Sequence, residues 1–493
     1  MKGKIVAGAS WVFTFRLAER ALGLVSTIVL ARLLVPDDFG VVAMATAVIA
    51  VIELATAFGF ELALVQHPAP ERRHYDTAWT LNVVVALIGA ATVAALASPM
   101  AAFFHEPRVT MIMLFLAGTA VIGGFENVGT VDFRRRMDFV REFMFMGGKR
   151  LFGFAVTMIG AVMFESYWAL LVGVLASRVA GVLLSNAMQP FRPRLSLSAA
   201  RELFRFSGWT LVSNLITAGL QRGPQFAVGR GGGSEALGLY VVAADVGAMP
   251  TTELAAPMNR AAIPGYARLV HDRAALKETF LDIGGLVAVV AIPAGLGLAS
   301  VAEPAVQALV GDKWLGAVPL IQLLAVSGVF VACGSNLGSL FVALGRPRVN
   351  SSFLGLRLAV LLVALAAFVP HWGALGAAWA ELTGAAASFA YAAWVTRQQA
   401  DVSLRQLLGR MWRPALAGGA MFASVSATLV ATAGLPSLAR LGVGVCVGVG
   451  TFVAGLALLW WVCGRAPGTE TIILRKIKVI VAQRRRTPSG EAP

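Results

Sequence analysis

Residues 77–98 read TAWTLNVVVALIGAATVAALAS, a run of 22 residues without a charged side chain. As an α-helix rising about 1.5 Å per residue, such a run is long enough to cross the roughly 30 Å hydrocarbon core of a bilayer. The whole chain of 493 residues is 58% hydrophobic and only 14% charged. Its mean hydropathy is +0.76. Because soluble domains are about 25% charged, this composition excludes a water-soluble globular protein.

Apolar runs of this kind recur along almost the entire chain. Only short connections separate them, and they are far too long for the strands of a membrane barrel, so their backbone can be satisfied in lipid only as helices. We therefore expect an all-α integral membrane protein with about 14 transmembrane helices, at residues 9–34, 39–65, 77–98, 109–130, 144–164, 168–188, 203–228, 236–258, 279–301, 317–344, 352–370, 372–396, 414–433 and 439–463.

Basic residues are distributed very unevenly between alternate loops. Of the 41 Lys and Arg, 31 fall on the side that holds both termini and five on the other side. Cytoplasmic loops carry the excess of Lys and Arg in multi-pass proteins, so both termini are predicted to be cytoplasmic. The net charge of +15 is thereby explained by topology, and a nucleic-acid partner is not expected.

Motifs for catalysis, metals and cofactors are not found in the sequence. The three cysteines are scattered through apolar runs, the five histidines lack metal-ligand spacing, and no Walker motif is present. The glycine run Gly229–Gly233 is not followed by Gly-Lys-Ser/Thr, and we interpret it as a flexible loop. We expect no catalytic residue, no metal and no cofactor.

An internal repeat divides most of the chain into two halves. An offset of 198 aligns the start of the sequence with its middle without gaps and matches Trp11 with Trp209, Arg32 with Arg230, and Gly40 with Gly238. Because this offset covers six spans, the two lobes have the same orientation and a pseudo-twofold axis along the membrane normal, with the substrate expected between them. The predicted parts are two six-helix lobes (1–195 and 196–400), two accessory C-terminal helices (401–464) and a basic cytoplasmic tail (465–493).

Charged side chains inside the predicted spans are the candidate functional residues. Insertion of each costs about 2.5–3.5 kcal/mol, so such residues usually face a water-filled cavity or a partner of opposite charge. Arginine suits an anionic headgroup because its planar guanidinium binds phosphate oxygens in pairs. The candidate substrate-binding residues are Arg16, Arg20, Arg178, Arg222 and Arg357.

Acidic residues in the same spans have two interpretations. They can bind a coupling proton or sodium ion, or they can form ion pairs that fix helix packing, for example Arg16 with Glu53. No spacing in the sequence decides between these roles. The candidates for ion coupling or charge pairing are Glu19, Glu53, Glu61, Asp245 and Glu253.

Several motifs resemble one transporter family. The segment Ile28–Gly40 reads IVLARLLVPDDFG; it closes the first span and opens the second. It resembles a segment of Wzx-like polysaccharide flippases, the colanic-acid-exporter type, in the superfamily that also holds multidrug transporters. Further matching segments are FHEP at 104–107, FRRRMDF at 133–139, YWAL at 167–170 and LFRFSGW at 203–209.

This resemblance implies a function in glycan export. Proteins of this type have two six-helix lobes around a V-shaped cavity and move an undecaprenyl-pyrophosphate-linked oligosaccharide from the cytoplasmic to the periplasmic leaflet. The implied setting is the bacterial inner membrane, during exopolysaccharide, capsule or O-antigen biosynthesis. The implied partners are the lipid-linked oligosaccharide, membrane lipids, a coupling ion and polysaccharide-assembly proteins.

Two other functions remain open. A multidrug or cation antiporter of the same superfamily would have a cavity dominated by acidic and aromatic groups, and the in-span arginines argue against it. A membrane glycan polymerase or ligase would present a sizeable outer loop with catalytic residues. The longest outer segment here, residues 300–317, is short and carries only Glu303, Asp312 and Lys313 as charges, so we expect a transporter and not an enzyme.

Overall fold

The computed structural model describes residues 22–23, 25–56, 59–204 and 208–464. Within these ranges the regular structure consists of helices and no strand occurs. The chain forms two compact units, the first made of residues 1–242 and 369–377 and the second of residues 243–368 and 378–493. The expectation of an all-helical membrane protein is confirmed, whereas the lobe boundaries predicted from the repeat stay a prediction.

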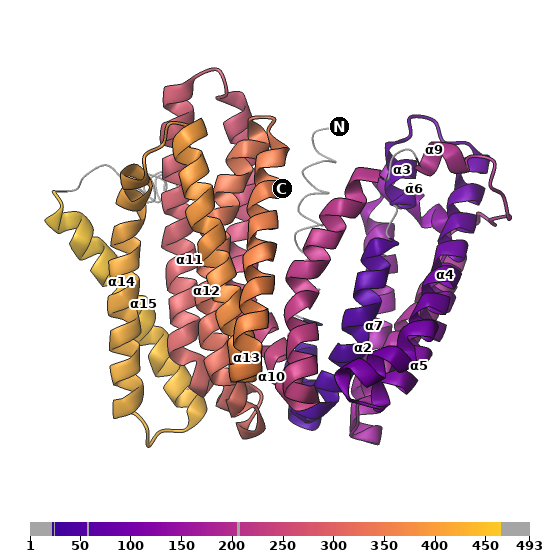
Figure 1. The fold of residues 1–493 in the computed structure, drawn as a ribbon, viewed down its shortest axis with the longest axis horizontal. Helices are drawn as coiled ribbons and strands as arrows, with labels where there is room; N and C mark the ends of the chain where they lie inside the picture. The colour runs from indigo at the N-terminus through magenta and orange to yellow at the C-terminus, as the bar shows by residue number, and fades with distance from the viewer. Residues whose placement is uncertain (1–21, 24, 57–58, 205–207, 465–493) are drawn as a thin grey trace, which may run out of the picture. The chain divides into compact units, whose positions relative to one another are not determined.

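Unit 1 is built from helix hairpins. Within it α4 packs along α5, α7 packs along α8, and α5 also contacts α2 and α8 (Figure 1). Its elements are α2 (Pro36–Ala55), α3 (Phe60–Gln66), α4 (Arg72–Phe104), α5 (Arg108–Gly124), η1 (Val128–Thr130), α6 (Val131–Arg135), α7 (Phe139–Phe164), α8 (Trp168–Met188), α9 (Ala200–Phe204) and the first part of α10 (Gly208–Arg268).

Unit 2 is centred on the long helix α11, which packs against α12, α14 and α15. Small residues allow these helices to approach closely, because a Cβ on Gly295 would overlap Val329 and a Cβ on Gly418 would overlap Ile292. The helices of this unit that follow α10 are α11 (Arg273–Leu309), η2 (Asp312–Ala317), α12 (Val318–Ala343), α13 (Pro347–Gln399, apart from residues 369–377), α14 (Leu404–Ala431) and α15 (Ser437–Val462).

Two very long helices each contain a break at a glycine. In α10 the non-helical residue is Gly233, with φ 79° and ψ −174°, and in α13 it is Gly373, with φ 54° and ψ −129°. A positive φ costs glycine little because it lacks a Cβ. The break at Gly233 falls between two predicted spans, and Gly373 is the second residue of the predicted span 372–396, close to the end of the span before it. The expectation of a flexible loop at Gly229–Gly233 was wrong, since the helix continues through Gly232 and only Gly233 departs from it.

Eight of the described helices are long and apolar enough to cross a membrane, and a ninth span is added if α5 and the bent segment Val128–Arg135 are counted together. One of the eight, α13, contains two of the predicted spans. The first predicted span lies largely outside the described residues. The number 14 therefore stays a prediction, while the multi-pass helical architecture is confirmed.

Candidate functional site

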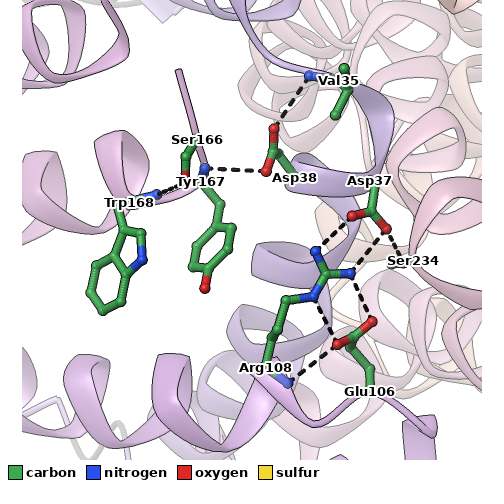
Figure 2. A network of polar contacts seen from close by, with 9 residues as sticks. All are labelled: Val35, Asp37, Asp38, Glu106, Arg108, Ser166, Tyr167, Trp168 and Ser234. Carbon is green, nitrogen blue, oxygen red and sulfur yellow. Dashed lines mark hydrogen bonds and ion pairs between the residues drawn. The ribbon is translucent and has the colours of Figure 1, made fainter. Parts of the chain in front are cut away.

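A network of charged and polar groups surrounds the first turn of α2, at the end of unit 1 where α4 also ends (Figure 2). The Arg108 guanidinium donates to Asp37 at 2.7 Å and 3.2 Å, and to Glu106 through two bonds of 2.8 Å. The Ser234 hydroxyl of α10 donates to the same Asp37 carboxylate. One arginine thereby connects the starts of α2 and α5, and Ser234 adds α10 to the group.

The neighbouring Asp38 extends this network to α8. Its Oδ1 accepts a hydrogen bond from the Tyr167 amide at 3.2 Å, and its Oδ2 accepts one from the Val35 amide at 3.4 Å (Figure 2). Both Asp37 and Asp38 lie in the first turn of α2, where the positive end of the helix dipole favours negative charge. We call Asp37, Asp38, Glu106, Arg108, Tyr167 and Ser234 the motif junction.

The motif junction brings together three segments that resemble one family. Asp37 and Asp38 belong to the segment 28–40, Glu106 belongs to FHEP at 104–107, and Tyr167 opens YWAL at 167–170. Arg108 directly follows FHEP and is separated from Asp37 by 71 positions. Three of the five motif segments therefore share a structural role, which is to connect α2, α5, α8 and α10.

Glu106 lies in the short connection between α4 and α5 and is half-buried. The hydrogen bonds from Arg108 hold the pKa of the Glu106 carboxyl below its ordinary value, although burial acts in the opposite direction. Glu106 is thus kept ionised as a partner of Arg108.

A close helix crossing lies beside the motif junction. A Cβ on Gly40 would overlap the Ser234 carbonyl group, and a Cβ on Gly238 would overlap the Pro36 carbonyl group. The two glycines are 198 positions apart, and so are Pro36 and Ser234. Segments related by the repeat therefore cross reciprocally, backbone against backbone, inside unit 1.

Charged side chains from the middle of unit 1 form a second group of contacts. Arg178 on α8 pairs with Glu53 on α2 at 3.1 Å, and their side chains are 44% and 55% exposed. Lys149 on α7 binds both oxygens of Glu126 at 3.2 Å. Charged groups within apolar helices are stable beside water or a partner of opposite charge, and Arg178 and Glu53 are partners of each other.

Arg134 connects two further carboxylates in unit 1. It lies 3.8 Å from Glu61 on α3 and 2.6 Å from Glu142 on α7. Neither Arg134 nor Lys149 was among the candidate residues from the sequence, which missed their pairing. The available signal was the position of their acidic partners Glu61 and Glu126 within apolar runs.

Unit 2 carries a more enclosed ion pair. Arg357 in the first half of α13 pairs with Glu381 in the second half at 3.0 Å, and their side chains are 19% and 13% exposed. Arg222 of α10, which belongs to unit 1, donates to Gln225 at 3.0 Å, and its buried Nε has no partner among the described residues. Asp245 is an exposed residue of α10 in unit 2.

The remaining predicted site residues cannot be placed in this network. Arg16, Glu19 and Arg20 lie outside the described residues, and so does the suggested pairing of Arg16 with Glu53. Glu253 lies in α10, and its side chain is not among those described. Of the ten candidates, the structure brings together Arg178 with Glu53, and it gives Glu61, Arg222 and Arg357 partners that the sequence did not name.

One side-chain cluster has the residue types of a metal site. Ligand atoms of His67, His74 and Glu202 lie within 4.8 Å of one another. However, the Glu71 amide donates to His74 Nδ1 at 3.0 Å, so His74 Nε2 carries the proton and donates to Glu202 at 3.0 Å. A metal-ligating histidine has the opposite arrangement, with its second nitrogen donating. The cluster is therefore a hydrogen-bonded contact between α4 and α9.

These features define a class: a multi-pass helical membrane transporter of two helical units with charged residues inside its spans. The family model described as "Polysaccharide biosynthesis protein" matches residues 29–319, and the chain belongs to this family.

Curated relatives are similar over most of their length. The chain is 25% identical over 357 residues to the lipopolysaccharide biosynthesis protein WzxC of Escherichia coli, covering 72% of each chain. It is 22% identical over 477 residues to the teichuronic acid biosynthesis protein TuaB of Bacillus subtilis, covering 96% of this chain and 98% of the relative. A third relative is the succinoglycan biosynthesis transport protein ExoT of Rhizobium meliloti, 24% identical over 67% of this chain and 68% of that protein.

Solved structures share the fold. The lipid II flippase MurJ matches with a TM-score of 0.75 at 9% identity, over 92% of this chain and 99% of its own. A multidrug resistance transporter of the MATE family matches with a TM-score of 0.59 at 14% identity, over 77% of this chain and 94% of its own. At these identities the likeness establishes the fold and nothing finer.

Proposed function

We propose that this protein is a flippase that moves a lipid-linked oligosaccharide, carried on undecaprenyl pyrophosphate, from the cytoplasmic to the periplasmic leaflet by alternating access. Its membership of the polysaccharide biosynthesis family supports this proposal, as do relatives named for lipopolysaccharide, teichuronic acid and succinoglycan biosynthesis. It acts as a transporter in the bacterial inner membrane, with both termini cytoplasmic, and carries out no covalent chemistry.

The observation that carries the proposal is the exposed Arg178 inside an apolar span of a protein from this family. A diphosphate headgroup requires cationic donors, and guanidinium groups supply them in pairs while staying charged. Glu53 neutralises Arg178 while no anion is bound, which lowers the cost of keeping the cation in the membrane. Arg16, Arg20, Arg222 and Arg357 are proposed as further cationic contacts for the same headgroup.

The acidic candidates are proposed to respond to the coupling ion. Arg178 leaves Glu53 when it binds the substrate phosphate, and the released carboxylate then binds a proton or sodium ion. Glu61 lies 3.8 Å from Arg134, which also pairs with Glu142, and it is proposed as a second carboxylate that binds the coupling ion. Glu19, Asp245 and Glu253 remain candidates on the sequence argument alone.

The drug antiporter of the same superfamily remains the alternative. The MATE likeness fits its fold, but the paired cations Arg178 and Lys149 in unit 1 suit an anionic substrate better than a cationic drug. Proteins that assemble the polysaccharide outside the membrane are the proposed partners.

Export of the glycan in a strain that lacks the chromosomal gene tests this function. Arg178→Ala, Arg16→Ala and Arg20→Ala are expected to reduce surface polysaccharide at least tenfold and to accumulate the lipid-linked precursor on the cytoplasmic side, with normal membrane insertion. Arg136→Ala is the matched control, because that side chain is 79% exposed and, among the residues that the structure describes, pairs with Asp132 in its own turn alone. Wild-type export by Arg178→Ala would remove Arg178 from the site. Absence of precursor accumulation in the gene deletion would contradict the flippase function itself.

A further inference from the structure

The connection between α8 and α9, residues 189–199, is an extended segment fixed against α4. Arg72 donates to the Arg192 carbonyl group at 3.1 Å, the Arg194 amide donates to Asp76 at 2.9 Å, and the Ser196 amide donates to Thr80 at 2.9 Å. Each step of two residues along the segment therefore corresponds to four residues along the helix. Two residues of extended chain and four residues of α-helix both span roughly 6–7 Å, so the two run in register. We call residues 189–199 the linker segment.

The segment then turns back along the same helix. The Ala199 amide donates to Thr77 at 3.2 Å, one turn behind Thr80. Earlier in the segment, Asn127 donates to the Phe191 carbonyl group at 2.7 Å. Thr77, Thr80 and Asn127 are all buried, so hydrogen bonds shielded from water hold the backbone of the linker segment in place.

Two highly exposed leucines of unit 1 lie at the tip of this segment. Leu195 is 76% exposed and Leu197 is 60% exposed. Because side chains alternate in an extended chain, the two leucines point to the same side. Two large apolar side chains held outward on a fixed backbone are costly in water, so a covering apolar phase is expected.

The position of Leu195 and Leu197 along α4 indicates that this apolar phase is the lipid bilayer. The charged first turns of α4 end at Asp76, and the uncharged run of 22 residues begins at Thr77. Ser196 is level with Thr80, about one helical turn beyond the last charge. Arg192 and Arg194, in contrast, are level with Arg72 and Asp76. Arginines thus lie at the depth of polar headgroups, and the leucines lie where the hydrocarbon begins.

We propose that the linker segment is a membrane-interface anchor that binds anionic phospholipid. Leu195 and Leu197 insert among the acyl chains of the adjacent leaflet, and Arg194 binds the phosphate of an anionic headgroup. Arg194 is exposed and its guanidinium makes no ion pair with the residues the structure describes, whereas Arg192 donates to the carbonyl groups of Gln189 and Phe191. This proposal does not depend on the transported substrate.

The insertion is tested with the full-length protein in lipid nanodiscs. Cys333, Cys446 and Cys463 are replaced by Ala, and an environment-sensitive fluorophore is attached to Leu195→Cys or Leu197→Cys. We expect doxyl-labelled lipid to quench both positions at least twofold more strongly than aqueous iodide does. The matched control is Ser198→Cys, exposed on the other side of the same segment, where iodide quenches more strongly. Stronger iodide quenching at both leucine positions would overturn the insertion and favour a soluble protein partner.

The headgroup preference has a separate test at the same labelled position. Doxyl-labelled phosphatidylglycerol is expected to quench Leu195→Cys at least twofold more than doxyl-labelled phosphatidylcholine. Adding Arg194→Gln should bring this ratio close to one, while Arg136→Gln should leave it unchanged. Equal quenching by the two lipids in the protein with Arg194 would contradict anionic binding.

Discussion

Arg108 donates hydrogen bonds to two carboxylates from different parts of unit 1, and its guanidinium is 38% exposed. Exposed ion pairs contribute little, whereas paired hydrogen bonds to charged groups contribute more, so we expect Arg108→Met to destabilise the protein by about 1–2 kcal/mol. Thermal unfolding in detergent measures this loss. Arg136→Met, with its highly exposed arginine, is expected to change stability by less than about 0.5 kcal/mol, and equal effects of the two variants would contradict a special role for Arg108.

The lowered pKa of Glu106 makes the stability contributed by this network dependent on pH. Because Arg108 lowers the pKa of the folded-state carboxyl, the stabilisation is fully present above the ordinary value of 4.5 and is lost as pH falls through the lowered pKa. Unfolding temperatures of the wild type and Glu106→Gln, compared between pH 7 and pH 3, should therefore converge below about pH 4.5. A difference that stays constant across this range would show that ionised Glu106 is not the stabilising partner.

For single residues, the sequence identifies important positions more successfully than it predicts their contacts. Segments 28–40, 104–107 and 167–170 were recognised as family motifs, yet nothing in their spacing placed Asp37 against Arg108 or Asp38 against the Tyr167 amide. Arg108 itself was not among the candidate residues from the sequence. Such pairings join positions 71 and 129 residues apart, and only helix packing decides them.

The close crossing of α2 and α10 requires glycine at the contact point of both helices. Gly238→Ala places a methyl group where the Pro36 carbonyl lies, so the helices must separate, and we expect a loss of about 1–3 kcal/mol. Thermal unfolding gives the size of the loss. Gly118→Ala is the control, because a Cβ at this site in α5 meets nothing within 4 Å and Ala favours helix by about 1 kcal/mol. Equal stability of Gly238→Ala and the wild type would show that the helices separate without cost.

Helices could be predicted from sequence where a local run of apolar residues defines them. Apolar length located the spans, and the breaks at Gly233 and Gly373 fall where two predicted spans meet. The linker segment was not foreseen, because its structure depends on Asp76, Thr77 and Thr80 from a helix more than 100 residues earlier.

For the whole molecule, the unequal distribution of Lys and Arg between alternate loops predicts the orientation in the membrane. The α9 end of unit 1 should face the cytoplasm and the motif junction the periplasm. In a cysteine-free background, a membrane-impermeant maleimide added to intact spheroplasts should label Glu235→Cys, next to Ser234, and should label Arg136→Cys only after permeabilisation. Both side chains are exposed, so access to water alone does not separate them. The reverse labelling pattern would invert the topology and the direction of transport.

The offset of 198 predicts two lobes, and Gly40 and Gly238, which this offset relates, lie at a reciprocal contact in the structure. Residue 40 meets residue 234 while residue 238 meets residue 36, an exchange that a two-fold axis generates in an isologous interface. Fusing two copies of an ancestral gene preserves such an interface inside one polypeptide. Neither half can lose its glycine alone, because a Cβ on either residue would overlap the backbone of the other half.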